Sequence, residues 1–179
     1  RIRNRVIRRI FVFFGGSDIT NETEKALKAI ELLNMPEVGV DVVVGAANPQ
    51  REHIRKLCND LKNIDFYCQV ENMAQLMVQA DLAIGGGGTT IWERCCVGLP
   101  SLVTVLAENQ KELVINLHDM GILLNLGYAD RMTVKDYKTG IQEMIQSPAK
   151  CRSQTEKALA LVPSADGADR VLDCMLEEA

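Results

Sequence analysis

Short apolar segments alternate with segments of helical periodicity over the first 110 residues of the chain. Apolar and β-branched residues fill five runs, and most of these runs end at a glycine or a polar residue, as buried strands do. Between the runs, apolar residues recur every three to four positions, which predicts helices. The predicted strands cover residues 9–14, 40–44, 64–70, 81–84 and 101–105, and the predicted helices cover residues 21–34, 49–62, 73–79 and 90–97.

Strands that alternate with helices form a parallel sheet with right-handed crossovers. The sequence therefore predicts an α/β fold: a Rossmann-like, doubly wound parallel sheet of about five to six strands. From Gln110 onward only helical patterns are visible, with breaks at Gly127, near Pro148 and over residues 163–167, and the last predicted helix covers residues 168–178. We expect this C-terminal third to form a helical cover.

The first predicted helix has a start signal of its own. Asn21 is a residue type that caps helices, and Glu24 follows three positions later, as in a capping box. We therefore expect Asn21 to cap this helix.

Length and composition fit one globular domain. The chain has 179 residues, of which 47% are hydrophobic and 25% are charged, so one core can form without help. Five of the first nine residues are arginine, which predicts a basic interdomain linker over residues 1–8 and a nucleotide-binding domain over residues 9–179. Because the chain begins with Arg1 and not with Met, we expect it to be cut from a longer protein whose N-terminal domain is missing here.

Composition also narrows the classes of partner. The net charge is −4, the basic residues gather at one end, and aromatic residues make up only 4%, so we expect no nucleic acid partner. No run approaches the roughly 18 to 20 apolar residues that span a bilayer. The six cysteines form no CxxC pair and neither histidine has metal-ligand spacing, so we expect no metal site, no cofactor and a reducing cytoplasm.

Parallel sheets bind ligands beyond the carboxyl ends of their strands, so the loops there should form one rim. The strongest signal on this rim is the run Gly85 to Thr90, four glycines and two threonines between a strand and a helix. Such glycines permit positive φ and close approach of a pyrophosphate, which threonine hydroxyls and the helix N-terminus can also bind. A flexible connection is the alternative, and we favour the anion site. The run matches neither GxGxxG nor the ATP-binding P-loop, which leaves a nucleoside diphosphate.

Three other features of the rim carry hydrogen-bonding groups, and each has a structural alternative. Glu93, one turn into the helix, can accept from a ribose diol or can be a solvated carboxylate. The turn of Gly15, Gly16, Ser17 and Asp18 can donate to a phosphate or can be an ordinary turn and helix cap. The side chains of Glu108, Asn109 and Gln110 suit sugar hydroxyls, or they merely start a helix.

The remaining residues with chemical potential receive no catalytic role. His53 and His118 lie in helical patterns with no acid or nucleophile at an obvious catalytic spacing, so we expect surface or packing positions. Trp92, Cys95 and Cys96 follow the glycine run, where we expect core packing.

The run from Ala80 to Pro100, with Ala107 to Gln110 after it and Phe14 to Asp18 before it, resembles the UDP-2,4-diacetamido-2,4,6-trideoxy-β-L-altropyranose hydrolases of pseudaminic acid biosynthesis. The resemblance covers nearly the whole chain as the C-terminal domain of that family. The family is related to the GT-B glycosyltransferases, among them the peptidoglycan UDP-N-acetylglucosamine transferase, which bind the nucleotide mainly through the second domain.

The resemblance implies UDP or a UDP-sugar as the ligand and assigns residues to its parts. It places the diphosphate on Gly87, Gly88, Thr89 and Thr90 with Gly16 and Ser17 nearby, the ribose on Glu93, the uracil at the backbone of Gln69 and Val70, and the sugar or diphosphate near Glu108, Asn109 and Gln110. The family's catalytic histidine belongs to an N-terminal domain that this sequence lacks. Related domains also occur fused behind a CMP-sialic acid synthetase-like domain.

Three hypotheses follow. The first is a UDP-sugar hydrolase whose nucleotide-binding half stabilises charge on the leaving group. The second is a transferase of the same architecture that passes the sugar to an acceptor other than water. The third is a non-catalytic nucleotide-binding module in a fusion protein. For the first two hypotheses we expect the catalytic residues to lie in the missing N-terminal domain.

Overall fold

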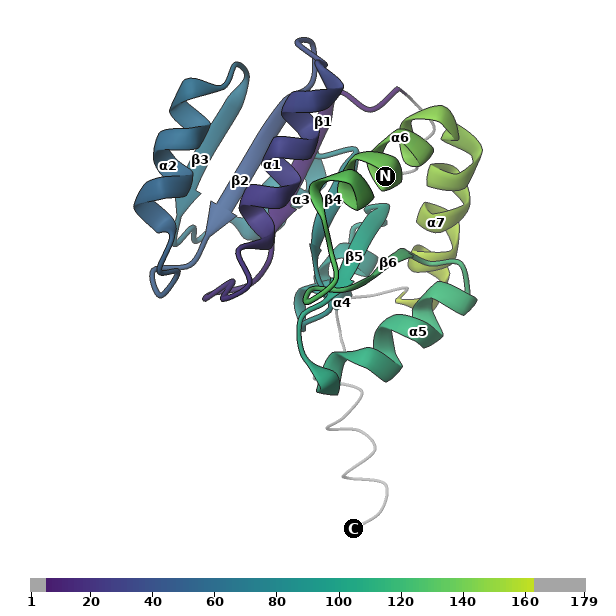
Figure 1. Ribbon diagram of the computed structural model, residues 1–179. Helices are drawn as coiled ribbons and strands as arrows, with labels where there is room; N and C mark the ends of the chain where they lie inside the picture. The colour runs from purple at the N-terminus through teal and green to yellow at the C-terminus, as the bar shows by residue number, and fades with distance from the viewer. Residues whose placement is uncertain (1–5, 163–179) are drawn as a thin grey trace.

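The computed structural model describes residues 6–162, and the predicted helix over residues 168–178 lies outside this range. Strands and helices alternate along the described chain (Figure 1). The strands are β1 (Arg9–Phe13), β2 (Gly39–Val44), β3 (Ile64–Cys68), β4 (Leu82–Gly86), β5 (Ser101–Val105) and β6 (Leu124–Tyr128). The helices are α1 (Glu22–Leu33), α2 (Arg51–Asp60), α3 (Met73–Gln79), α4 (Thr90–Cys96), α5 (Lys111–Asp119), α6 (Val134–Gln146) and α7 (Pro148–Leu161), and a 3-10 helix covers Glu108–Gln110.

All six strands run parallel in one sheet of order β3-β2-β1-β4-β5-β6. The order reverses between β1 and β4, because the chain first adds β2 and β3 on one side of β1 and later adds β4, β5 and β6 on the other. Loops leave the sheet in opposite directions at such a switch point, and this opens a crevice at the carboxyl ends of the strands. The predicted doubly wound α/β fold is therefore confirmed.

Helices cover both faces of the sheet, which explains why its central strands are almost wholly apolar. Buried side chains of α1, α2 and α6 pack on one face against alternate residues of β1, β2, β4 and β5. Buried side chains of α3, α4 and α5 pack on the other face. In Figure 1, α1 and α6 lie in front of the sheet, and α3 and α4 lie behind it.

The five predicted strands are confirmed, but the prediction that only helices follow Gln110 is wrong. β6 lies at the edge of the sheet, next to β5, and all five of its residues are partly exposed. Its sequence includes Asn125 and Gly127, residue types that are rare in strands, and its register with β5 shifts at Val103 and Thr104. Pairing with β5, which no local pattern reveals, holds this segment in the sheet.

The first helix has a different cap from the predicted one. Asn21 adopts a left-handed conformation with φ of 55°, and its side chain makes no capping hydrogen bond. The carboxylate of Asp18 instead accepts from the N–H groups of Glu22 and Thr23, both at 2.9 Å. Asp18 thus satisfies two N–H groups that the helix leaves open, and it anchors the turn that follows β1.

A buried polar network holds α1 and α6 against the sheet beneath this turn. The hydroxyl of Tyr137 donates to the carboxylate of Glu22 at 2.8 Å and lies 2.8 Å from the hydroxyl of Thr104 on β5. Burial raises the pKa of Tyr137, and the nearby negative charge of Glu22 adds to the effect. The ring of Tyr137 also packs edge-on against Phe14, with the ring centroids 5.8 Å apart. The network therefore fixes the end of β1.

No helix within residues 6–162 combines the length and the apolar character needed to cross a membrane.

Candidate functional site

A pocket of about 230 Å³ opens at the switch point of the sheet, between the loops that follow β1 and β4. The two glycine turns predicted as ligand loops line this pocket together, although about 70 residues separate them in the sequence. The end of β5 and the 3-10 helix close its third side. The lining residues are Phe13, Phe14, Gly15, Gly16, Gly86, Gly88, Thr89, Thr90, Leu106 and Gln110.

Three of the four consecutive glycines are closely packed inside the protein. Gly85 and Gly86 belong to β4, and a Cβ on Gly85 would overlap the carbonyl oxygen of Phe13. A Cβ on Gly86 or Gly87 would lie 2.5 Å from a side-chain carbon of Leu106 or Val114. None of the four adopts a positive φ. The expectation that positive φ contributes to this run is therefore wrong, and close packing accounts for Gly85, Gly86 and Gly87.

The glycines that face open space are Gly15, Gly16 and Gly88. A Cβ on Gly15 or Gly16 would meet no atom within 4 Å, and one on Gly88 would meet only the side-chain amide nitrogen of Gln110, at 3.7 Å. Gly15 also has a φ of 92°, which few residues other than glycine adopt. These three glycines leave the backbone accessible on the pocket side.

The segment from Gly88 to Thr90 presents unused hydrogen-bond donors. Among the described residues, no backbone hydrogen bond engages the N–H groups of Gly88 and Thr89, whereas their carbonyl groups accept from the next turn of α4. Thr89 is exposed and precedes α4 without a side-chain capping bond. Both the backbone and the hydroxyl of Thr89 can therefore donate to an oxygen-rich ligand.

Gln110 braces the opposite wall of the pocket. Its side-chain oxygen accepts from the N–H of Leu106 at 3.0 Å. This bond turns the amide nitrogen toward Gly88. Asn109 and Glu108, its neighbours in the 3-10 helix, are exposed and do not line the pocket, and Glu108 forms an ion pair with Lys111.

Arg94 lies directly behind the glycine loop and was not singled out from the sequence. Its guanidinium group donates from Nη2 to the carbonyl oxygen of Gly86 at 2.7 Å and from Nε to that of Thr90 at 3.3 Å. Only 3% of Arg94 is exposed, and burial lowers its pKa to about 10. The signal that could have revealed it is a cation at position i+3 of the apolar stripe that also contains Ile91 and Cys95.

The other predicted ligand residues lie on the same rim but outside this pocket. Ser17 is exposed beside Gly16, and Glu93 is exposed on α4. Gln69 follows β3 with a φ of 57°. Val70 borders a second hollow of about 320 Å³ between β3 and α3. The structure thus brings four of the predicted diphosphate residues, Gly16, Gly88, Thr89 and Thr90, into one pocket. Gly87 is buried behind the pocket wall, and Ser17 and the predicted ribose and uracil residues lie outside the pocket.

The residues without a predicted catalytic role have mixed outcomes. His53 is exposed and lies 3.3 Å from the carboxylate of Glu24, and His118 contacts the carbonyl oxygen of Leu123, so the surface and packing positions are confirmed. Cys95 is buried in the core as predicted. Trp92, however, is 42% exposed, and the prediction of core packing for it is wrong because it lies on the solvent side of a short helix.

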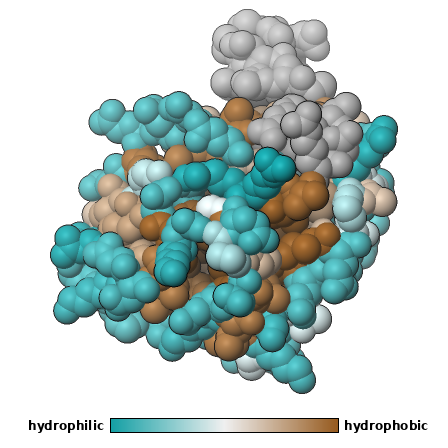
Figure 2. Space-filling model, turned by 90° about the horizontal axis from the view of Figure 1, so that it is seen from above, coloured by the Kyte–Doolittle hydropathy of each residue, from teal (hydrophilic) through white to brown (hydrophobic). Residues whose placement is uncertain are grey.

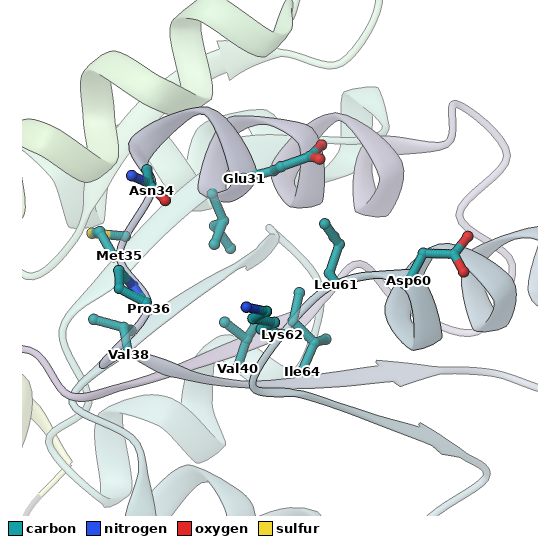
Figure 3. A pocket seen from close by; sticks show the side chains of 11 residues that line it. Glu31, Asn34, Met35, Pro36, Val38, Val40, Asp60, Leu61, Lys62 and Ile64 are labelled. Atoms are coloured by element: carbon teal, nitrogen blue, oxygen red, sulfur yellow. The ribbon is translucent and has the colours of Figure 1, made fainter.

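A further hollow of about 220 Å³ lies at the other end of the sheet (Figure 3). Side chains from the end of α1, the end of α2 and the first residues of β2 and β3 line it, and most of them are apolar, such as Met35 and Val38. Figure 2 looks onto this end and shows several apolar areas separated by hydrophilic side chains. None of the predicted site residues lies in this hollow.

Comparison with known proteins identifies a family for the chain. A family model, "Glycosyltransferase family 28 C-terminal domain", matches residues 9–171. The chain is 33% identical over 124 residues to the spore coat polysaccharide biosynthesis protein SpsG of Bacillus subtilis. That alignment covers 69% of this chain but only 37% of SpsG, so the chain spans about a third of this relative.

Solved structures with the same fold include a protein bound to a sugar nucleotide. The structure of MurG from Acinetobacter baumannii superposes with a TM-score of 0.76 at 19% identity, over 96% of this chain and 50% of MurG. The UDP-GlcNAc 2-epimerase from Neisseria meningitidis, bound to UDP-GlcNAc, superposes with a TM-score of 0.72 at 14% identity, over 96% of this chain and 45% of that one. At these identities the similarity establishes the fold, the second half of the GT-B architecture.

Proposed function

Because the chain belongs to the glycosyltransferase family 28 C-terminal domain family, we propose that it is the half of a two-domain glycosyltransferase that binds the sugar nucleotide. The observation that carries this proposal is the pocket at the switch point, where Gly88, Thr89 and Thr90 face Gly15 and Gly16 across the crevice. Free N–H groups and hydroxyls on one side, and accessible backbone on the other, suit the oxygens of a diphosphate.

We propose UDP as the nucleotide. The structural neighbour from Neisseria meningitidis holds UDP-GlcNAc, and this similarity of fold supports the same class of ligand here. The geometry is compatible with it, because β3 lies two strand spacings, about 10 Å, from β1 along the rim. A nucleotide whose diphosphate occupies the pocket can thus extend its ribose toward Glu93 and its uracil toward the backbone of Gln69 and Val70.

Transfer of the sugar is better supported than its hydrolysis. The matching family is one of glycosyltransferases, and SpsG, the relative from Bacillus subtilis, takes part in the biosynthesis of a polysaccharide. Hydrolysis of a UDP-linked amino sugar stays a second candidate, because the motif from Ala80 to Pro100 resembles the pseudaminic acid hydrolases. No observation specifically favours the third hypothesis, a non-catalytic role in a fusion protein.

Turnover is proposed to need groups from elsewhere in the full-length enzyme. None of the described residues lining the pocket is a histidine, a carboxylate or an amine, so the pocket itself offers no general acid or base. The N–H and hydroxyl donors can still stabilise the negative charge that develops on a departing diphosphate, which is a catalytic contribution of the binding half.

Calorimetric titration of the 179-residue chain with UDP, UMP and CMP tests the assignment. We expect UDP to bind more tightly than UMP, because the second phosphate fills the pocket, and we expect CMP to bind more weakly than either. A preference for CMP, or no heat with any of the three nucleotides, would contradict the proposal.

A second measurement addresses the reaction. The chain is incubated with UDP-N-acetylglucosamine, and released UDP is quantified by chromatography. We expect binding without release of UDP. Steady release by the chain alone would show that it carries its own catalytic group and would overturn the division of labour proposed here.

A further inference from the structure

None of the described residues that line the proposed diphosphate pocket carries a positive charge. The described lining residues of this pocket are glycines, threonines, apolar side chains and one glutamine. The helix behind it, α4, has only seven residues, or about two turns, so the partial charge at its N-terminus is a weak counter-charge for two phosphates. A positive charge is nevertheless hydrogen-bonded to the loop: the guanidinium group of Arg94, which is buried beneath it.

We infer that Arg94 is a positioning residue that holds the Gly85–Thr90 loop in its binding conformation and supplies the buried positive charge that compensates the diphosphate. This inference deepens the proposed function and rests on it. The role differs from that of an exposed phosphate-binding arginine, because the guanidinium group reaches the anion through the loop and not by direct contact.

The hydrogen bonds of Arg94 bracket the proposed diphosphate residues. Nη2 binds the carbonyl oxygen of Gly86, at the end of β4, and Nε binds that of Thr90, at the start of α4. Gly87, Gly88 and Thr89 lie between these two points. A Cβ on Gly85 would come within 3.2 Å of Nη1, so the guanidinium group packs directly against the glycine run. Arg94 thus holds both ends of the segment in which the N–H groups of Gly88 and Thr89 have no backbone partner among the described residues.

The charge of Arg94 has no carboxylate partner among the described residues. No aspartate or glutamate of that part of the chain lies within ion-pair distance of it, and its neighbour Glu93 is exposed. A buried cation without an ion-pair partner is costly, and desolvation lowers the pKa of Arg94 to about 10 although the nearby charge of Glu93 opposes this shift. The guanidinium group stays protonated at neutral pH, so an anion on the other face of the loop would add the close counter-charge that the described residues do not supply.

If Arg94 only supports the loop, a neutral hydrogen-bond donor in its place would be enough. If its charge also compensates the diphosphate, the loss of that charge should affect ligands with more phosphate groups more strongly. Trp92, the only tryptophan of the chain, lies partly exposed on α4 three residues after Thr89 and reports binding by its fluorescence. The variants are Arg94→Lys, which keeps the charge, and Arg94→Gln, which keeps a donor without charge. Arg131→Gln, a change of an arginine whose side chain is 84% exposed, is the matched control.

Each protein is titrated with uridine, UMP, UDP and inorganic pyrophosphate. We expect Arg94→Gln to lower the affinity for UDP and for pyrophosphate by tenfold or more. The affinity for UMP should fall by less, and the affinity for uridine should change by less than twofold. Arg94→Lys should recover at least threefold of the loss for UDP, and Arg131→Gln should match the wild type throughout. Circular dichroism and thermal unfolding of each variant check that it is folded.

The wild-type protein gives a test that needs no variant. We expect the ¹⁵Nε–H resonance of Arg94 to shift when pyrophosphate is added and to stay in place when uridine is added. If the variants fold but their affinities for all four ligands fall equally, Arg94 only supports the loop and the inference is wrong. The same conclusion follows if the Arg94 resonance does not shift when pyrophosphate is added. If pyrophosphate binding depends on Arg94 but a parallel titration shows that CDP binds the wild type as tightly as UDP does, the inference stands and the proposed nucleotide is wrong. If the wild type binds neither UDP nor pyrophosphate, both are wrong.

Discussion

Two single-methyl substitutions, Gly88→Ala and Gly85→Ala, separate the glycines that serve the pocket from those that serve the fold. At Gly88 a new Cβ would have open space apart from the Gln110 amide nitrogen 3.7 Å away, and φ is not positive. At Gly85 a new Cβ would overlap the carbonyl oxygen of Phe13 on the neighbouring strand, where only a backbone movement gives relief. The same chemical change should therefore affect different properties at the two positions.

The two substitutions should change the free energy of unfolding differently. Gly88→Ala should leave the free energy of unfolding unchanged or raise it by up to about 1 kcal/mol, because alanine restricts the unfolded chain. Gly85→Ala should lower it by about 3 kcal/mol, the upper end for overpacking, because the clash is with backbone. For a protein of this size that is a fall of roughly 6 to 12 °C in the unfolding temperature.

Binding should follow the reverse pattern. The methyl group of Gly88→Ala projects into the proposed phosphate pocket and should remove one hydrogen bond to a charged oxygen, which costs about 1.5 to 3 kcal/mol or roughly 10- to 100-fold in affinity for UDP. Scanning calorimetry measures the first property, and isothermal titration with UDP measures the second. If Gly88→Ala binds UDP within twofold of the wild type, or if Gly85→Ala unfolds at the wild-type temperature, this assignment of the glycines is refuted.

Three further predictions concern the loop hydroxyls, the buried network and the rim. Thr89→Ala combined with Thr90→Ala should weaken UDP binding by about 1 to 3 kcal/mol in a calorimetric titration, and an unchanged dissociation constant would remove these hydroxyls from the site. Tyr137→Phe leaves the buried carboxylate of Glu22 without its hydroxyl donor and should cost about 1 to 3 kcal/mol in urea unfolding; equal stability would show that another group replaces that donor. Cys68, which is exposed at the end of β3, should react with a maleimide in the free protein and be protected by UDP, as read by peptide mass spectrometry, whereas equal labelling would place the uracil elsewhere.

The layered architecture could be predicted because local pattern and tertiary environment agree. The central strands are buried on both faces, so their runs of valine, isoleucine and phenylalanine are continuous and unmistakable. β6 could not be predicted, because its partly exposed residues lack that pattern and its pairing with β5 depends on contacts distant in sequence. The cap of α1 was misassigned for a related reason. Asn21 and Asp18 are both capping residue types, and only the path of the turn decides which of them faces the helix.

The candidate site shows the same division between local and distant information. The sequence placed both glycine turns on one rim, and the structure brings them into one pocket. It could not distinguish glycines that face the pocket from those that face neighbouring strands, because the clashes of Gly85 and Gly87 involve residues of β1 and α5. The role of Arg94 could not be predicted from the sequence, because a charged residue on a short helix normally lies in solvent and its burial depends on the three-dimensional structure.

Burial of Arg94 also connects the stability of the domain to its proposed role. A cation whose pKa is lowered by burial destabilises the folded protein at neutral pH, where the group is charged, and that penalty declines only as the pH rises above about 10. Binding of a diphosphate should offset part of the same penalty, so part of the ligand's stabilisation is the relief of a cost already present in the free protein. Such a cost at a binding loop is typical of sites that are arranged for function at the expense of stability. A solvent-exposed arginine would bind water and counter-ions in the free state, whereas the hydrogen bonds of Arg94 within the described residues go to two carbonyl groups of the loop, so its charge stays available to an anion on the other face.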